Sequence, residues 1–590
     1  MPDQPQAARP AAPIIRRLTI ERFRGIKALT WHPGPGVNVI LGGGDVGKTT
    51  LLEAIALLLS PTNAGTISDT DYYRRDVGAG LAIEAVVSLP GDSGINDQVR
   101  ASWPWQWDGS DTVVPAAEGQ GEPGEPVYKL RVRGTADLEL AFEVLQPDGS
   151  ADPLSVALRR SIGLVRLAGD DRGDRDLRLV QGSALDKLVS DNALRSRIAT
   201  ALAGTDIEEQ LLPAGKKALE DLDDAFTYEG LPDILGLSII GGPGPSIASL
   251  IGLTADKDDV SLPLTMWGAG TRRLSALAIT AFNQRSAPVT IVDEVERGLE
   301  PYRQRRLISK LQDGSGQVFL TTHSPSTIAA AAKSRFWYVD AAGKIGRLDE
   351  AKIARHRAND PAAFLSRFAV IAEGKTEVGF VCRLLEKALG GALDQHGIHV
   401  TDGGGNESTL DLLEALAEGG VAFGGFADNE NVHPVRWQTL IAAQGAKVFR
   451  WDAGCLEDNI IGAVADASLE ALAADADARK TGQRLRTLQE RLGTADKAFA
   501  TLRAAAPGDS LRSVMIEAAK GTVPDGTAEE DRNHLKSHAQ TWFKSLDGGR
   551  ELADKMFAFA LWPAFKDRLL PFCNAVLTAV GIDAVADIQP

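Results

Sequence analysis

The stretch "GVNVILGGGDVGKTTLLEAIALLLS", residues 36–60, decides the fold of the N-terminal half of the chain. Its apolar start predicts a buried strand, and its end predicts a helix. Between them, "GGGDVGKTT" (42–50) fits the pattern G-x4-G-K-[ST], whose glycines let backbone N–H groups curl around phosphates. A strand, a glycine-rich loop and a helix in this order predict an α/β domain that binds a nucleotide.

This loop supplies most of the residues that we expect to hold ATP. Lys48 would reach the β and γ phosphate oxygens, and Thr49 would ligate Mg²⁺. The N-terminus of the following helix adds a favourable dipole for the phosphate charge. The residues expected to bind ATP from this loop are Gly42, Gly44, Asp45, Gly47, Lys48, Thr49 and Thr50.

Two later segments complete the expected ATP site. In "PVTIVDEVERGLEP" (288–301) a buried strand ends at Asp293, which is placed to hold Mg²⁺ directly or through water. The neighbouring Glu294 can position or deprotonate the attacking water. In "GQVFLTTHSP" (316–325) His323 follows another strand, where a side chain would sense the γ-phosphate. We therefore expect ATP with one Mg²⁺ ion here.

Acidic residues follow three strands of a second α/β region. In "FAVIAEGKTE" (368–377) Glu373 ends a strand and Glu377 lies one turn into the next helix. Two more strand ends, in "VAFGGFADNE" (421–430) and "AKVFRWDAGCLEDN" (446–459), add further acids. These are Asp428, Glu430, Glu457 and Asp458.

Taken singly, each acid also fits an ordinary role, such as a first-turn glutamate near the helix dipole or a capped turn. Taken together, they are expected to meet, because the carboxyl ends of parallel strands converge on one edge of a sheet. Carboxylates gathered there would repel one another unless hard cations bound between them. The pattern predicts two Mg²⁺ or Mn²⁺ ions about 4 Å apart, which can clamp both oxygens of a phosphodiester displacement.

Composition excludes several classes of protein. The 590 residues predict two to four domains, and 44% hydrophobic with 24% charged residues is ordinary for a soluble protein. Three widely spaced cysteines without a CxxC pair argue against a disulfide framework or a zinc site. No signal peptide or membrane span is evident, so we expect a cytoplasmic protein. The net charge of −16 means that any nucleic acid must be met by local basic patches or by metals.

The motifs of the first half carry a family resemblance. The segment "IERFRGIKALTWHPGPGVNVILGGGDVGKTTLLEAI" (20–55) resembles the N-terminus of the ABC ATPases of DNA metabolism, the RecF and SMC group. "VDEVERGLEPYRQRRL" (292–307) resembles their Walker B motif and D-loop, and "TTHSP" (321–325) their H-loop. The candidate signature segment, "MWGAGTRRLSALAI" (266–279), departs from the usual LSGGQ order. Since no long heptad run separates Lys48 from Asp293, the chain resembles a short-insert member of the group.

The second acidic site resembles a Toprim domain, which has an E…DxD acidic signature. "AEGKTE" (372–377) matches its first element, whereas "ADNE" (427–430) has Glu430 where the usual last acid is aspartate. An ABC-type head followed by Toprim is the layout of the OLD (overcoming lysogenization defect) family of ATP-dependent nucleases. That family includes the nuclease subunit of the Gabija antiphage system.

This resemblance implies two-metal DNA cleavage with five carboxylate ligands and one basic residue that stabilises the transition state. The implied metal ligands are Glu373, Glu377, Asp428, Glu430 and Glu457. For the basic residue, "WFKSLDGGRELADK" (542–555) favours Lys544, with Lys520 and Arg550 as alternatives. The resemblance also implies DNA as a partner, a homodimer or higher homo-oligomer, and a possible UvrD-like helicase partner.

The expected fold class is α/β, in two linked parts. An ABC-type ATPase head spans an N-terminal lobe (1–182), a helical dimerisation insertion (183–255) and a C-terminal part (256–350). A Toprim nuclease domain (365–590) follows, with a helical insertion at about 465–540. The predicted function is an ATP-regulated, metal-dependent DNA endonuclease in antiphage defence or DNA repair. The alternative is a RecF-like DNA-binding ATPase whose Toprim module does not cut.

Overall fold

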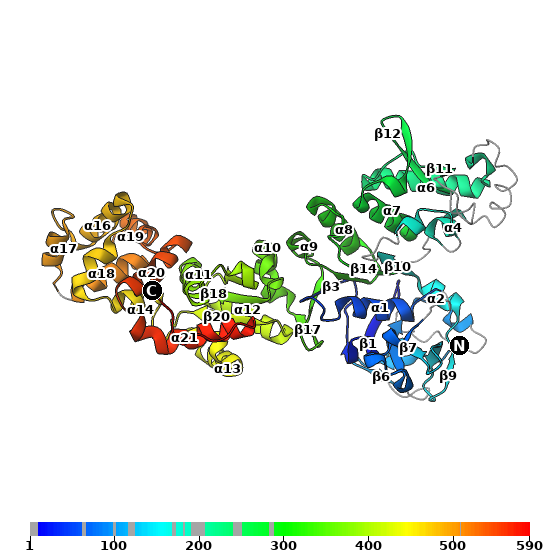
Figure 1. Ribbon diagram of the computed structural model, residues 1–590, viewed down its shortest axis with the longest axis horizontal. Coiled ribbons are helices and arrows are strands. Elements are labelled where there is room, and N and C mark those ends of the chain that lie inside the picture. The colour runs from blue at the N-terminus through cyan, green and yellow to red at the C-terminus, as the bar shows by residue number, and fades with distance from the viewer. Residues whose placement is uncertain are drawn as a thin grey trace, which may run out of the picture. The chain divides into compact units, whose positions relative to one another are not determined.

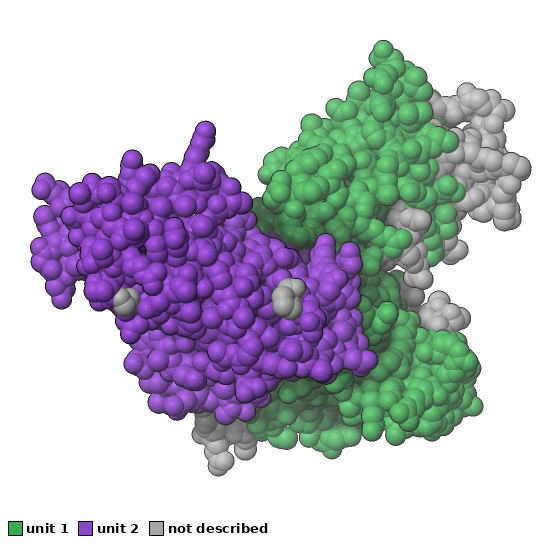
Figure 2. All heavy atoms as spheres, turned by 60° about the vertical axis from the view of Figure 1, so that its left-hand side comes forward, with its two compact units in different colours: residues 1–347 green, residues 348–590 purple. Residues whose placement is uncertain are grey.

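The computed structural model describes most of the chain as two compact units, residues 1–347 and 348–590 (Figure 2). The described residues are 10–61, 67–97, 102–115, 124–167, 173–180, 183–189, 207–239, 251–282, 288–507 and 509–589. Each unit has hydrophobic clusters of its own. Over these ranges, no helix combines the length and the apolar character that crossing a membrane requires.

An antiparallel sheet forms the N-terminal part of the first unit. Its strands lie in the order β2-β1-β4-β7-β5-β6, and β8 and β9 extend it from β7. Most of its strands come from residues 81–150, where antiparallel strands were expected from the turn residues. The bounds are β1 (Ile14–Phe23), β2 (Ile26–Trp31), β4 (Leu81–Ser88), β5 (Trp105–Trp107), β6 (Thr112–Val113), β7 (Glu125–Gly134), β8 (Leu140–Leu145) and β9 (Ala151–Pro153).

A second sheet of the first unit has the order β10-β14-β15-β3-β16-β17, and its strands from β10 to β16 run parallel. Strands β14 and β15 are buried along their whole length, as expected for parallel strands covered on both faces. The strands are β3 (Val37–Gly42), β10 (Leu164–Leu167), β14 (Val289–Val292), β15 (Val318–Thr321), β16 (Arg335–Val339) and β17 (Ile345–Leu348). The principal helices are α1 (Lys48–Leu58), α8 (Pro301–Asp313) and α9 (Pro325–Ala330).

The expectation of a purely helical insertion over residues 183–255 is wrong. Its described residues include helices α4 and α6, but also strands β11 and β12 of a three-stranded antiparallel sheet, ordered β11-β12-β13. Short apolar runs of this kind fit a strand or a helix equally well by periodicity, so the pattern could not separate them. The elements are α4 (Ala184–Val189), α6 (Pro213–Glu229), β11 (Gly236–Ile239), β12 (Ile251–Lys257) and β13 (Val260–Pro263).

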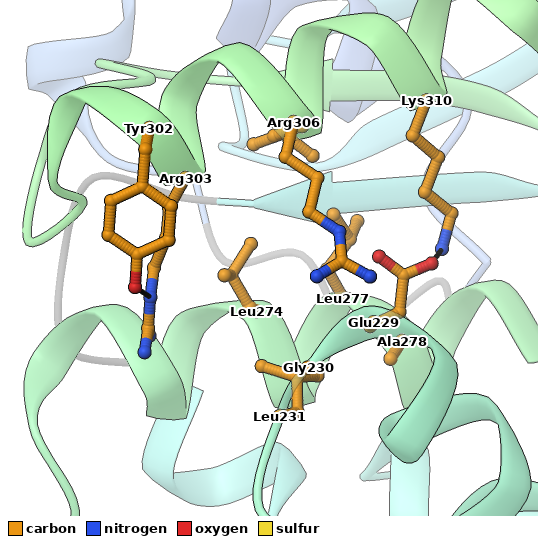
Figure 3. Close-up of a pocket in the computed structure, with 11 residues that line it drawn as sticks. Glu229, Gly230, Leu231, Leu274, Leu277, Ala278, Tyr302, Arg303, Arg306 and Lys310 are labelled. Atoms are coloured by element: carbon orange, nitrogen blue, oxygen red, sulfur yellow. Dashed lines mark hydrogen bonds and ion pairs between the residues drawn. The ribbon is translucent and has the colours of Figure 1, made fainter.

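This insertion is joined to the rest of the first unit where α6 meets α7 (Ala269–Phe282) and α8, around a small cavity (Figure 3). Its apolar lining comes from Leu231 of the insertion and from leucines of α7 and α8. Polar contacts close its rim: Arg306 donates a hydrogen bond to the carbonyl of Tyr228, and Lys310 Nζ lies 2.5 Å from Glu229 Oε1. The insertion and α8 therefore pack as one body.

The second unit is built on a parallel sheet of four strands, in the order β19-β18-β20-β21. Strands β18 and β20 at its centre are completely buried. Its strands are β18 (Phe368–Ala372), β19 (Ile398–Asp402), β20 (Phe423–Ala427) and β21 (Val448–Arg450). Its neighbouring helices are α11 (Lys375–Leu389), α12 (Asn406–Gly419), α13 (Pro434–Gln444) and α14 (Leu456–Gly462).

Residues 340–364, at the end of the first expected domain and before the second, contain β17 and a helix, α10 (Glu350–Asn359). Helix α10 belongs to the second unit, because Arg355 Nη1 donates to the Gly403 carbonyl at 2.9 Å. The unit therefore begins near residue 348, and not at residue 365. The polar sequence of α10 gave no sign of this, since Arg355 and His356 contact the backbone carbonyls of Gly403 and Asp402.

Helices make up the C-terminal part of the second unit, including the expected helical insertion at about 465–540. Figure 1 shows α16, α17, α18 and α19 gathered together, away from α12 and α13 of the same unit. The helices are α15 (Leu469–Ala473), α16 (Ala478–Leu492), α17 (Phe499–Ala505), α18 (Asp509–Lys520), α19 (Glu529–Thr541), α20 (Leu546–Ala558) and α21 (Trp562–Ala579).

Candidate functional site

The glycine-rich loop between β3 and α1 has the backbone that a phosphate cradle needs. Gly42 and Gly47 have φ angles of 149° and 98°, which favour glycine. A Cβ atom on Gly42 would also lie 2.6 Å from the carbonyl oxygen of Val339. The adjoining cavity, of about 620 Å³, is lined by Asp45, Gly47, Lys48, Thr49 and Thr50, among others. Gly44 is exposed at the tip of the same loop.

Lys48 is buried and folds back onto its own loop. Its Nζ donates hydrogen bonds to the carbonyl oxygens of Gly42 (3.0 Å) and Gly43 (2.5 Å). Burial lowers the pKa of Lys48, and the charges of Asp293 and Asp45 oppose that shift. A phosphate in the cavity would give this ammonium group a better partner than two neutral carbonyls, so the loop fits ATP.

The structure brings the expected Mg²⁺ ligands together. Thr49 Oγ1 lies 3.4 Å from Asp293 Oδ1, although the two residues are far apart in the sequence. Thr321 Oγ1 donates to the same oxygen of Asp293 at 2.6 Å and accepts from the backbone N–H of Glu294 at 2.8 Å. The carboxylate of Asp293 is therefore oriented from two sides, as a metal ligand should be.

Glu294 and His323 lie at the same end of the parallel sheet. Glu294 has a φ angle of 50°, unusual for a residue other than glycine, and its side chain is 48% exposed. His323 is exposed, and its backbone N–H donates to Glu296 Oε1 at 2.6 Å. Both side chains are accessible to solvent at this end of the sheet, and the positive φ angle at Glu294 is of the kind that occurs at functional sites.

Arg273 is a residue of this site that the sequence did not single out. It lies on α7, in the candidate signature segment, and it is buried. Its guanidinium donates to the carbonyls of Glu294 (2.7 Å) and Arg297 (2.9 Å), and also to that of Asp293. Burial lowers the pKa of Arg273 to about 10. No sequence pattern encodes a side chain that binds backbone carbonyls, so no signal could have found it.

We expect Arg273→Ala to lower the kcat of ATP hydrolysis about 10- to 100-fold, because a shift of about 1 Å in a reacting group has that effect. The KM for ATP should change little, since the described contacts of Arg273 are with the Asp293–Arg297 loop and not with the phosphate loop. Arg273→Lys should restore part of the rate.

Steady-state ATPase assays check this expectation, with Arg272→Ala as the control. Arg272 is the neighbouring arginine and forms an ion pair with Asp174 instead, at 2.6 Å. A KM that rises as much as kcat falls in Arg273→Ala would contradict the expectation, because Arg273 would then also support nucleotide binding.

Four acids of the second unit meet at the carboxyl edge of its sheet. Glu373 follows β18, and its Oε2 accepts from the backbone N–H of Asp428 at 2.9 Å. Asp428, at the end of β20, accepts from the Leu456 N–H at 3.0 Å, one residue before Glu457. Glu377, Asp428 and Glu457 are all buried. The acids of three strand ends are thus linked through the backbone, as expected from the parallel order of the strands.

Glu430 differs from the other four acids because it is exposed. Its charge nevertheless acts on Glu373: burial is the main cause that raises the pKa of Glu373, and Glu430 contributes to the same shift. Asp458 has a different role. It accepts from the Cys455 N–H and pairs with Lys520 at 2.9 Å, so it caps a helix outside the cluster.

The structure distinguishes the three basic candidates. Lys544 Nζ lies 3.0 Å from Glu457 Oε1, inside the acidic cluster. Burial by itself would lower the pKa of Lys544. The attraction of its ammonium group to Glu457 and Glu377 is stronger than this effect, so the pKa of the lysine is raised. Lys520 pairs with Asp458, and Arg550 pairs with Glu386 at 2.8 Å. Lys544 is therefore the one of these three that contacts the buried acids.

A close contact between helices places Lys544 beside Glu377. A Cβ atom on Gly379 of α11 would lie 1.9 Å from the Leu546 carbonyl oxygen of α20. A Cβ on Gly549 of α20 would in turn lie 1.9 Å from the Thr376 carbonyl oxygen. The backbones of α11 and α20 therefore touch at Gly379 and at Gly549, close in the chain to Glu377 and to Lys544.

The acid cluster fits divalent cations with oxygen ligands. Among the described residues, Glu377 Oε1 and Glu457 Oε2 are buried without a partner, and Glu457 Oε1 has only its ion pair with Lys544. Burial, together with repulsion between the acids, raises the pKa values of Glu377 and Asp428. One lysine cannot balance several buried carboxylates, whereas Mg²⁺ or Mn²⁺ would supply both the charge and the missing ligand partners.

We expect Mg²⁺ or Mn²⁺ to raise the melting temperature more at pH 8 than at pH 6. The pKa values of Glu377 and Asp428 are higher in the folded protein than in the unfolded chain. The stability of the metal-free protein therefore falls as the pH rises from the unfolded-state pKa to the folded-state pKa. At the higher pH a metal ion also competes with fewer protons for these carboxylates. A pKa shift of one unit changes the free energy of unfolding by about 1.4 kcal/mol. In a domain of this size that changes the melting temperature by roughly 3–6 °C. Thermal melts with and without metal at both pH values check it, and an equal rise at both would contradict it.

Two further residues support the cluster and were missed. Asn406 Nδ2 donates to Glu373 Oε2 at 3.0 Å, and its Oδ1 accepts from Trp437 Nε1 at 3.0 Å. Arg450 Nε donates to the Asp428 carbonyl at 3.1 Å. Asn406 directly follows the three glycines of the segment "TDGGGNES" (401–408), which was the available signal. Asp402 of that segment binds the Gly404 N–H and shapes the loop.

Three family models match parts of the chain. The one described as "AAA domain" matches residues 17–100, and "AAA domain, putative AbiEii toxin, Type IV TA system" matches residues 142–329. The one described as "Overcoming lysogenization defect protein-like, TOPRIM domain" matches residues 364–429. That last match contains Glu373, Glu377 and Asp428.

Curated relatives and solved structures are similar to the first half. The DNA replication and repair protein RecF of Teredinibacter turnerae is 46% identical over 46 residues, 8% of this chain and 12% of its own length. RecF of Brucella abortus is 25% identical over 391 residues, 56% of this chain and 96% of its own length.

Among solved structures, an Smc head bound to the C-winged helix domain of ScpA aligns with a TM-score of 0.37 and 13% identity, over 58% of this chain and 99% of its own. A structure of the recombination mediator protein RecF aligns with a TM-score of 0.34 and 13% identity, over 58% of this chain and 100% of its own. The chain therefore joins AAA ATPase modules to an OLD-like Toprim module, which is the order of modules in an ATPase–Toprim protein of the OLD type.

Proposed function

We propose that this protein is a divalent-metal-dependent DNA endonuclease whose Toprim site is regulated by its ATPase. The observation that supports the proposal most directly is the group of buried acids beside Lys544, in which Glu377 Oε1 and Glu457 Oε2 have no partner among the described residues. A module that merely bound DNA would gain nothing from burying several mutually repelling carboxylates.

Glu373, Glu377, Asp428 and Glu457 would hold two Mg²⁺ or Mn²⁺ ions, with the exposed Glu430 as an outer ligand. When bound, such ions activate a water molecule and stabilise the charge that develops on a phosphate. Asn406 orients Glu373 for this task, and the cation of Lys544 would face the phosphate oxygens.

In the ATPase, Lys48, Thr49 and Asp293 would hold ATP with one Mg²⁺, and Glu294 would orient the attacking water. His323 would sense the γ-phosphate. We propose that the protein acts as a homodimer or larger homo-oligomer in the cytoplasm, in antiphage defence or DNA repair, like the Gabija nuclease. A UvrD-like helicase is a further proposed partner.

A second candidate function is favoured by the RecF of Brucella abortus, whose similarity to this chain extends over 96% of its own length. In that case the chain would be a DNA-binding ATPase of recombination or repair with a Toprim module that does not cut. Nuclease assays separate the two candidates.

The test uses supercoiled plasmid with Mg²⁺ or Mn²⁺, with and without ATP. Nicking that persists in Lys48→Ala under at least one nucleotide condition, and is lost in Glu373→Ala, would support cleavage at the Toprim site. The comparison with and without ATP also gives the direction of the regulation. No cleavage with either metal, in a protein that still hydrolyses ATP, would favour the second candidate.

A further inference from the structure

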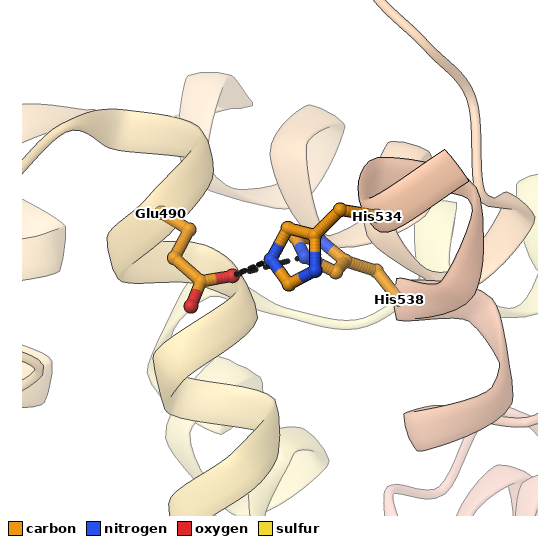
Figure 4. Close-up of side chains that lie close together, drawn as sticks. All are labelled: Glu490, His534 and His538. Carbon is orange, nitrogen blue, oxygen red and sulfur yellow. Dashed lines mark hydrogen bonds and ion pairs between the residues drawn. The ribbon is translucent and has the colours of Figure 1, made fainter. Parts of the chain in front are cut away.

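A group of three metal-ligating side chains lies in the helical part of the second unit, apart from the Toprim acids. Glu490 comes from α16, and His534 and His538 come from α19 (Figure 4). The two histidines are four residues apart, so they project from the same face of their helix. The ligand atoms of all three residues lie within 4.8 Å of one another.

The geometry brings the three side chains to one point. Glu490 Oε2 lies 2.9 Å from His534 Nε2 and 3.0 Å from His538 Nε2, as the dashed lines of Figure 4 show. Ligands bound at about 2.0–2.1 Å around a tetrahedral zinc ion are separated by little more than this. A small outward movement of each side chain would therefore admit an ion where the two hydrogen bonds now lie.

We propose that Glu490, His534 and His538 bind a transition-metal ion of the Zn²⁺ class. Two imidazoles and one carboxylate favour zinc and its neighbours, whereas the all-oxygen Toprim cluster favours Mg²⁺ or Mn²⁺. The sequence argued against a zinc site through the cysteines alone, and this site uses none. Exposures of 60% for His534 and 36% for Glu490 leave a fourth position open to water.

One contact opposes the ion. Arg491 Nε donates to His538 Nδ1 at 3.2 Å, which places the proton of that ring on Nε2, the ligand atom. Metal binding would move this proton to Nδ1 and displace Arg491, which keeps its hydrogen bonds to the carbonyls of Thr522 (2.9 Å) and Leu535 (3.1 Å). The lost hydrogen bond costs about tenfold in an equilibrium constant. The binding constants of zinc sites with several protein ligands exceed this tenfold cost by many orders of magnitude, so Zn²⁺ should bind despite the lost hydrogen bond.

The ion would serve as a clip between α16 and α19. These helices also meet through Trp542, whose Nε1 donates to Thr487 Oγ1 at 2.9 Å, two residues before Lys544. A bound metal would add a second link between α16 and α19 and close the chain between Glu490 and His534. Its effect should therefore be on the stability of the helical part, and not on the chemistry of the Toprim acids.

The test uses the full-length, untagged protein after metal is removed, with Mg²⁺ in excess to occupy the Toprim acids. Wild type should bind one equivalent of Zn²⁺ per chain in equilibrium dialysis, melt at a higher temperature with it, and give the visible spectrum of four-coordinate Co²⁺ after substitution. His534→Ala should weaken binding roughly 100-fold, and Glu490→Gln roughly 10-fold. His396→Ala, a histidine of the same unit outside the group, should bind as wild type does.

His534 is a suitable position because its exposed side chain can be removed without opening the core. Failure of wild type to retain Zn²⁺ at micromolar concentration would overturn the proposal. So would equal binding by wild type and His534→Ala, because the ion would then lie elsewhere. Neither result depends on whether the protein cuts DNA.

Discussion

Replacing Glu377 by glutamine is expected to reduce metal-dependent plasmid nicking by at least roughly 1000-fold, because it removes a ligand charge from a two-metal site. The substitution keeps the size of the side chain, and Glu377 is 3% exposed, so the shape of the core should persist. Quantified conversion of supercoiled plasmid, with Mg²⁺ and with Mn²⁺, measures the effect.

A second readout separates lost ligation from lost folding. Burial and the nearby charge of Glu457 raise the pKa of Glu377, so its charged form destabilises the metal-free protein at any pH above ordinary carboxyl values. Glu377→Gln should therefore melt at a higher temperature than wild type at pH 8 without metal, and gain less from added Mg²⁺.

The matched control is Glu386→Gln, which changes an acid on the same helix that pairs with Arg550. Its nicking rate should stay within a few-fold of wild type. A Glu377→Gln protein that nicks within tenfold of wild type would remove Glu377 from the metal site.

Glu294→Gln is expected to lower ATP turnover by roughly 100- to 1000-fold, while nucleotide affinity changes less than about threefold. Glutamine cannot take a proton from the attacking water, but it keeps the size of the side chain. Affinity should persist because the described phosphate-loop contacts of Lys48 and Thr49 do not involve the Glu294 side chain. Phosphate release and binding of a fluorescent nucleotide measure the two quantities separately.

Glu300→Gln serves as the control for this loop, since Glu300 precedes α8 and its side chain is 58% exposed. If Glu294→Gln hydrolyses ATP at the wild-type rate, the attacking water is oriented by another residue. Glu296 is then the next residue to test, because its carboxylate binds Thr322 and the backbone of His323.

The strand ends could be predicted from sequence because their chemistry is local. Asp293 and Asp428 each follow an apolar run that is long enough for one buried strand, and the loop at Lys48 has a fixed spacing. The parallel order of β18 and β20 then brings their acids to one edge without further information. This is why the α/β class and most of the expected site residues come from short patterns.

What the sequence could not give were contacts made through the backbone or over long separations. Arg273 binds carbonyl oxygens, which every residue has, so its partners leave no pattern. Asn406 lies in a glycine-rich segment, and the sequence gives no sign that its side-chain amide donates a hydrogen bond to Glu373. The strands at 236–239 and 251–257 are too short for periodicity to separate them from helix.

The paired glycines of α11 and α20 make the second unit unusually sensitive to two single substitutions. A single methyl group at Gly379 or Gly549 would drive apart the backbones that hold Glu377 and Lys544. Such a substitution would change no charged or hydrogen-bonding residue, yet it would move Lys544 away from the acids. Loss-of-function variants of this protein should therefore include small apolar substitutions at two positions that have no chemistry of their own.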